Sequence, residues 1–142
     1  MEFSGEATVC GTPEAVWRAL RDDAVVVRLL PAAREMRRTA PGVYEGALLV
    51  GPPPLVRRQP ARVEIAGDRE AFRVSVQGTD RREPLTIGVS CALAAMDRRT
   101  RLRYRVTAEL GPLGRLLGGG ATQRLIADFF RGLEEVLRSG NG

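Results

Sequence analysis

The sequence predicts an α+β domain in which a curved antiparallel sheet of seven strands surrounds one long C-terminal helix. Three observations lead to this prediction. Segments that alternate apolar and polar residues make up most of positions 2 to 110, two short helical stretches follow the first of these segments, and apolar residues recur three and four positions apart from residue 112 to residue 138. Each strand has one apolar face, so the sheet is expected to curl around the large terminal helix.

The first elements are marked by capping residues. Residues 2–9 alternate as a strand with one wet face. Thr12 suits the N-cap of a helix over residues 13–21, and Pro13 suits its first position. A second short helix is expected over residues 24–30, because Pro31 disfavours helical geometry in the residue before it.

Six further strands follow, separated by turn residues. Pro41-Gly42, Gly51-Pro52-Pro53-Pro54 and Gly67-Asp68 each interrupt the alternation, since proline cannot donate to a strand ladder and glycine suits tight turns. The expected strands cover residues 35–39, 44–50, 57–66, 72–76, 85–93 and 102–110.

The terminal helix is expected over residues 112–138, long enough at ~1.5 Å per residue to cross a small domain. Gly118-Gly119-Gly120 lies within it and costs roughly 1 kcal/mol per glycine relative to alanine, so we expect a bend or a loosened turn there. The run is either a hinge that admits a ligand or a tolerated poor helix segment. Without repeats or a linker, residues 1–142 are expected to form a single domain.

Composition excludes several kinds of site. All 22 basic residues are Arg, the formal net charge is +5, and neither Lys nor His occurs. Schiff-base lysines, histidine acid–base pairs and His-ligated metals are therefore excluded, and we expect neither a metal nor a cofactor. Cys10 and Cys91 lack zinc spacing and are interpreted as separate reduced thiols. No apolar run is long enough to span a bilayer, and no leader is evident. These features predict a cytoplasmic protein, either free or bound peripherally at the inner face of the membrane.

A sheet that grips a helix leaves an apolar cavity wherever side chains do not fill the space between them. Small residues at inward positions would leave space for such a cavity: Gly5, Ala7, Gly46, Ala61 and Ala108. The alternative is that Trp17, Phe72, Phe129 and Phe130 fill it.

Three polar residues face this interior. Tyr44 and Tyr104 would each orient a ligand's polar end or bond the backbone. Gln59 would need a ligand, a water or a neighbour for its amide.

The chain resembles the helix-grip superfamily, which includes START-related and birch-pollen-allergen-like proteins (the SRPBCC group), and within it the G subunit of carbon monoxide dehydrogenase and its relatives. The matching stretches run in order through the whole chain: Glu2-Phe3-Ser4-Gly5-Glu6, Thr12-Pro13-Glu14-Ala15-Val16-Trp17 with Leu20, Tyr44-Glu45-Gly46-Ala47 on to Val50-Gly51-Pro52, Thr100-Arg101-Leu102-Arg103-Tyr104, and Asp128-Phe129-Phe130-Arg131-Gly132-Leu133. Two departures are Pro31-Ala32, where the family has Pro-Gly, and Gln59, near a family aromatic.

The resemblance implies a non-enzymatic protein that binds or transfers a hydrophobic small molecule, such as a lipid or a quinone, and that assists assembly or membrane recruitment of a CO dehydrogenase-type molybdenum hydroxylase. The alternative is a polyketide cyclase/hydratase-like enzyme that uses the same cavity. No catalytic residues are assigned. Leu30, Met36 and the 51–55 turn are candidates for a lid. The expected ligand-binding residues are Leu30, Tyr44, Leu48, Gln59, Val63, Phe72, Val89, Tyr104, Ile126, Phe129 and Phe130.

The wet face of the last strand carries Arg101, Arg103 and Arg105, and Arg57, Arg58 and Arg62 are expected on the same outer surface. This surface is either a solvated face or a patch for acidic protein, RNA or anionic lipid. Because single-strand nucleic-acid platforms need interleaved aromatics, which are missing here, we expect no nucleic-acid partner. The sequence leaves the oligomeric state open.

Overall fold

The computed structural model confirms the predicted fold class. It describes residues 1–50, 54, 56–80, 82, 84–109 and 111–140, and for residues 50, 112–121 and 140 it describes the backbone alone. Within these residues the elements run in the order β1 (Glu2–Cys10), α1 (Pro13–Leu20), α2 (Asp23–Leu29), β2 (Ala33–Ala40), β3 (Val43–Val50), β4 (Arg57–Gly67), β5 (Ala71–Gly78), β6 (Thr86–Met96), β7 (Arg99–Glu109) and α3 (Gly111–Gly140).

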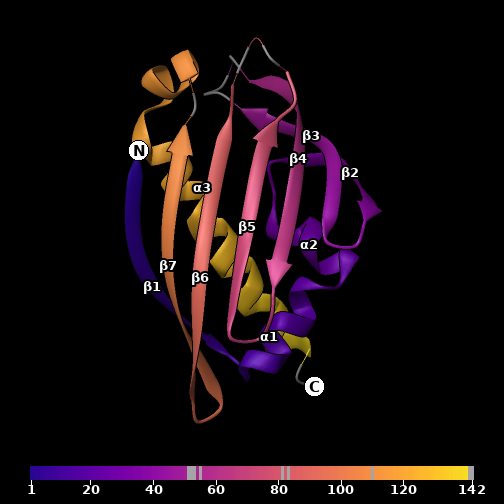
Figure 1. Cartoon of the computed structure of the whole chain (residues 1–142), viewed down its shortest axis with the longest axis vertical. Coiled ribbons are helices and arrows are strands. Elements are labelled where there is room, and N and C mark those ends of the chain that lie inside the picture. The colour runs from indigo at the N-terminus through magenta and orange to yellow at the C-terminus, as the bar shows by residue number, and fades with distance from the viewer. Residues whose placement is uncertain (51–53, 55, 81, 83, 110, 141–142) are drawn as a thin grey trace.

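The seven described strands form one antiparallel sheet in the order β1-β7-β6-β5-β4-β3-β2, so that the first strand lies beside the last. In Figure 1, α3 runs diagonally behind this sheet, while α1 and α2 lie near one end of it, close to the C-terminus. The sheet therefore has an inner face toward α3 and an outer face that the helices do not cover.

The alternation expected from the sequence decides which face each side chain joins. On β4, Gln59, Ala61, Val63 and Ile65 are buried while the residues between them are exposed. Successive side chains of a strand point to opposite faces, so each of these buried residues faces α3. The same holds for β7, where Leu102 is fully buried and its neighbour Arg103 is exposed.

The first short helix begins at the predicted cap, Thr12, whereas the second begins at Asp23, one residue before the predicted start, with Asp22 as a cap that the sequence analysis did not identify. The Thr12 hydroxyl accepts a hydrogen bond from the Ala15 backbone N–H at 3.2 Å, and the Asp22 carboxylate accepts one from Ala24 at 3.0 Å. These bonds satisfy backbone donors that a helix start leaves without a partner. The helices end one residue before the predicted bounds.

The C-terminal half of α3 packs tightly against α1, α2 and β1. Leu133 of α3 and Leu29 of α2 are fully buried. A Cβ on Gly132 would lie 3.2 Å from Leu29 Cδ2, so the absence of a side chain lets the two helices approach closely. The Cys10 backbone N–H donates to Glu134 Oε2 at 2.7 Å and fixes the end of β1 to the helix. Gly118–Gly120 lies within α3, and the helix continues through it without a loosened turn, one of the two features expected there.

Candidate functional site

An aromatic cluster lies between β7 and α3. The Tyr104 ring stacks on Phe130 with centroids 4.8 Å apart, and Phe129 meets Phe130 edge-on at 5.4 Å. A Cβ on Gly5 would lie 2.4 Å from the Tyr104 hydroxyl oxygen. The space that we expected Gly5 to leave for a ligand is therefore occupied by Tyr104.

The Tyr44 hydroxyl has a side-chain partner. Tyr44 is 3% exposed, and its hydroxyl donates to Asp23 Oδ1 of α2 at 2.7 Å. Burial, followed by this hydrogen bond and the charge of Asp23, raises the pKa of Tyr44 from 10.0 to about 12. The hydroxyl therefore bonds a carboxylate and not the backbone, and this bond ties α2 to β3.

Gln59 places an amide inside the apolar face of the sheet. Gln59 is 2% exposed and pairs with Leu48 of the neighbouring strand β3. A Cβ on Gly78 would lie 2.7 Å from Gln59 Nε2, so this glycine makes room for the amide on the neighbouring strand. The inward orientation predicted for Gln59 is confirmed.

Sequence reasoning missed Thr122. This residue lies on the face of α3 that also carries Ile126, Phe129 and Leu133, at spacings of four, seven and eleven residues. It is 2% exposed, and its hydroxyl has no hydrogen-bond partner among the residues that the structure describes. The helical spacing could have identified it, but a hydroxyl residue carries no apolar signal for the inner face of a helix.

The predicted ligand-binding residues all belong to the inner side of the sheet or to the elements that close it. Tyr104 is half-buried and packs against the core, whereas the others are buried: Leu30, Tyr44, Leu48, Gln59, Val63, Phe72, Val89, Ile126, Phe129 and Phe130. Met36, the second lid candidate, is half-buried against the same core. Of the 51–55 turn, residues 51–53 and 55 lie outside the described residues, and Pro54 is exposed.

Gly46 does not provide room for a ligand, contrary to the expectation from its inward position. The edge strand β2 bulges between Arg34 and Arg37, with Glu35 at a φ of 57°. A Cβ on Gly46 would lie 2.8 Å from the Arg34 carbonyl oxygen and 2.9 Å from that of Glu35. The bulged backbone of β2 therefore takes the space beside Gly46.

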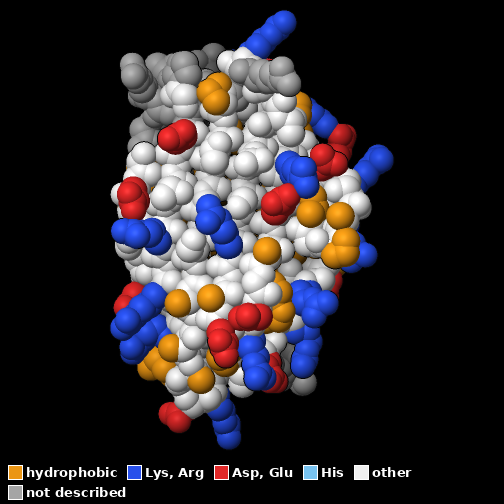
Figure 2. Space-filling view, viewed as in Figure 1, with side chains coloured by type: hydrophobic (Ala, Val, Ile, Leu, Met, Phe, Trp, Pro, Cys, Tyr) orange, Lys and Arg blue, Asp and Glu red, His pale blue; other side chains and the backbone are white. Residues whose placement is uncertain are grey.

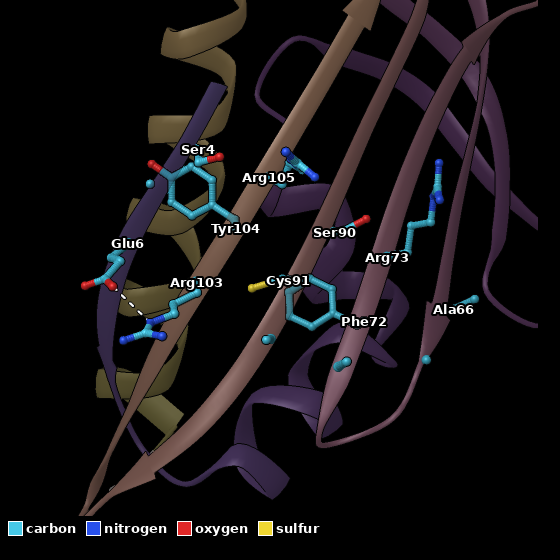
Figure 3. Close-up of a pocket in the computed structure, with 14 residues that line it drawn as sticks. Ser4, Glu6, Ala66, Phe72, Arg73, Ser90, Cys91, Arg103, Tyr104 and Arg105 are labelled. Atoms are coloured by element: carbon cyan, nitrogen blue, oxygen red, sulfur yellow. Dashed lines mark hydrogen bonds and ion pairs between the residues drawn. The ribbon is translucent and has the colours of Figure 1, made fainter. Parts of the chain in front are cut away.

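A second site lies on the outer face of the sheet. A depression of about 910 Å³ spans strands β4, β5, β6, β7 and β1, and Figure 3 shows its lining. Its outward-facing side chains are Ser4, Glu6, Ala66, Ala71, Arg73, Ser90, Ala92, Arg103 and Arg105. The sequence predicted an arginine surface here, but neither the depression nor Arg73 was identified.

The remaining chemistry-bearing groups are few. Cys91 is buried, and burial raises the pKa of its thiol from 9.0 to about 12, so it stays a neutral thiol near neutral pH. Cys10 and Cys91 are both free thiols. Within the described ranges, no three His, Cys, Asp or Glu side chains are grouped to hold a metal ion. No helix in the described part of the chain has the length and apolar character that crossing a bilayer requires.

The family model for the G subunit of carbon monoxide dehydrogenase (CoxG) matches residues 5–138. No curated protein matches the sequence. Among solved structures, a conserved protein from Geobacillus kaustophilus is 21% identical with a TM-score of 0.83, over 98% of this chain and 96% of that one. Ara h 8.0201 is 19% identical with a TM-score of 0.69 over 98% of both chains. The di-domain ARO/CYC protein StfQ from the steffimycin biosynthetic pathway is 11% identical with a TM-score of 0.68, over 99% of this chain and 52% of StfQ.

Proposed function

The chain belongs to the CoxG family, that of the carbon monoxide dehydrogenase G subunits, and from this premise we propose that it binds a hydrophobic small molecule between its sheet and α3, without catalysis. The ligand is a lipid, a quinone or a similar apolar molecule, held within a single domain of residues 1–142. The protein carries or presents this ligand in the assembly or membrane recruitment of a CO dehydrogenase-type molybdenum hydroxylase. It acts in the cytoplasm or peripherally at the inner membrane face.

The observation that carries the proposal is the buried Thr122 hydroxyl. A buried hydroxyl without a partner costs about 1–3 kcal/mol, and native proteins rarely tolerate one without a reason. On the inner face of α3, next to apolar residues such as Ile126, it is suited to bond one polar atom of an otherwise apolar ligand. Apolar walls with a few placed polar groups are typical of small-molecule sites.

The other polar side chains of the inner face have different roles in this proposal. Gln59 of β4 adds a buried amide to the inner face, which favours a ligand orientation that places a polar group near it. The Tyr44 hydroxyl serves the fold, since it is already bonded to Asp23. The rings of Tyr104 and Phe130 stack beside Gly5 of β1 and form an apolar wall there.

The alternative, a polyketide cyclase/hydratase-like enzyme, is favoured by the fold similarity to StfQ. It needs an acid or a base in the interior whose pKa lies near the working pH. Tyr44, with a pKa of about 12, does not supply one near neutrality. Turnover of an activated ester or a polyketide, lost in Tyr104→Phe, would support the enzyme over the carrier.

The test combines native mass spectrometry with a binding titration of Nile red, an apolar dye that has a ring carbonyl. We expect the recombinant protein to carry a co-purified apolar molecule and, once delipidated, to bind the dye. Thr122→Val replaces the hydroxyl by a methyl group, so dye binding should weaken by about tenfold while stability is unchanged or raised.

The matched control is Thr107→Val, which removes an exposed hydroxyl on the outer face of β7 and should change neither quantity. Carriage of an apolar ligand is refuted if the protein is free of co-purified molecules and binds no dye. Equal dye affinity in Thr122→Val and the wild type would remove Thr122 from the site.

A further inference from the structure

The outer depression contains a row of polar side chains that runs across four strands. Arg73 of β5 lies opposite Ser90 of β6, Ser90 lies opposite Arg105 of β7, and Arg105 lies opposite Ser4 of β1. Neighbouring strands are about 4.8 Å apart, so Ser90 stands midway between two arginines whose backbones are about 10 Å apart. Figure 3 shows Arg73, Ser90 and Arg105 in this order across the sheet.

The cations of the row differ in their partners. Arg105 Nε lies 2.9 Å from Glu2 Oε1, and in the next row Arg103 Nε lies 3.0 Å from Glu6 Oε1. Arg73 forms no ion pair with any residue that the structure describes. Its guanidinium lies over Gly88, where Nη2 would be 3.4 Å from a Cβ on that glycine. Arg73 therefore supplies an unneutralised positive charge above a floor without bulky side chains.

The floor of the depression decides which anionic partner fits. It is made of backbone and of small side chains, Ala66, Ala71, Ala92 and Ser90, and Figure 2 shows separate Arg side chains standing out from this face. The aromatic residues of these strands, Phe3, Phe72 and Tyr104, pack against the core, so no base could stack on an aromatic ring of the outer face. The floor also lacks an outward-facing large apolar side chain for insertion among lipid tails, so a membrane surface fits it poorly.

We propose that this depression is a docking site for an acidic segment of a partner protein. A carboxylate of that segment bonds the free guanidinium of Arg73 and the hydroxyl of Ser90, while the segment's backbone lies close to the small side chains of the floor. Complementary charges at an exposed surface speed and orient association more than they tighten it. The site is separate from the interior of the grip and does not depend on ligand binding there.

The experiment titrates ¹⁵N-labelled protein with a short synthetic peptide that alternates Glu and Ala, and follows the amide signals by NMR. We expect shifts confined to β5, β6, β7 and β1 around Arg73, Ser90 and Arg105. The matched peptide with Gln in place of Glu should cause none. Binding should disappear as ionic strength rises from about 0.1 M to about 1 M, because the screening length falls to a few ångströms.

Arg73→Gln should weaken peptide binding by about fivefold, the upper range for one exposed charge pair. Arg131→Gln on α3 makes the same change in net charge at an exposed residue far from the depression, and it should leave binding unchanged. Shifts spread over the whole surface, or equal losses in the two variants, would overturn the proposal in favour of attraction by net charge alone. Shifts caused by vesicles of anionic phospholipid, but not by the peptide, would replace the protein partner by a membrane.

Discussion

The two faces of strand β7 differ in almost every respect. Its inward residues Leu102 and Val106 are fully buried against the core, whereas its outward neighbours Arg103 and Arg105 have side chains that are 67% and 70% exposed. Burying a leucine side chain is worth about 1.5–3 kcal/mol, while an exposed ion pair contributes about 0–1 kcal/mol. The inner face therefore holds the fold together, and the outer face can serve recognition at little cost in stability.

Polar groups on the inner face are the exceptions to this division. The Tyr44 hydroxyl is bonded to Asp23, and Gly78 makes room for the Gln59 amide. Thr122 is left without a partner among the described residues. In each case the fold keeps a group that an apolar residue could replace, so these positions are where stability and function can be separated by mutation.

The largest effect is expected from Leu133→Ala. This residue is fully buried where α3 meets α1 and α2, so the substitution loses the transfer free energy of the side chain and leaves a cavity. We expect the free energy of unfolding in urea to fall by about 2–5 kcal/mol.

The control for Leu133→Ala is Val27→Ala on α2, where the side chain is 45% exposed and the expected change is under about 0.5 kcal/mol. If Leu133→Ala costs no more than Val27→Ala, the inner face is not the stabilising one and the comparison fails.

An intermediate effect is expected from Tyr44→Phe. The change removes the hydrogen bond to Asp23 but leaves that carboxylate half-exposed to water and near Arg38, so no buried charge is stranded. We expect a loss of about 1–2 kcal/mol in the free energy of unfolding at neutral pH.

The Tyr44 contribution should also depend on pH. The folded-state pKa of Tyr44, about 12, lies above the ordinary value of 10.0. The stabilisation is therefore fully present below pH 10 and is lost as the pH rises toward 12, because the unfolded chain releases this proton first. Wild-type stability should fall more steeply than that of Tyr44→Phe across this window in urea unfolding. The chain has no Lys to titrate there, and every other titratable group is common to both proteins. Parallel pH profiles would show that Tyr44 is not held in its neutral form.

Sequence alone predicted the elements well, because each left a local signal. Thr12 and Pro13 marked a helix start, and the two-residue period of residues 57–66 marked a half-buried strand. Contacts between elements could not be predicted from the sequence. The bulge of β2 that takes the space beside Gly46, and the reach of Tyr44 to Asp23 on α2, depend on register and helix placement. No period of a single segment contains that information.

On the outer face, too, the sequence pattern of single strands did not reveal which residues come together. The alternation of β7 predicted outward arginines along one strand, whereas Arg73 lies on β5 and comes near Arg105 because both pair with Ser90 of β6. Small residues on four strands form the depression together. A patch assembled from several strands becomes visible when the strand order is known.

The smallest effect is expected from Arg103→Gln. Its ion pair with Glu6 is exposed on both sides, so solvent screens the attraction and two flexible side chains lose freedom to form it. The free energy of unfolding should fall by about 0.2–1 kcal/mol at low salt, and the difference from the wild type should vanish near 1 M salt. Urea unfolding at the two ionic strengths measures both values. A loss above about 2 kcal/mol that persisted in salt would mean that the outer face also holds the sheet together, and its arginines could then not be assigned to recognition.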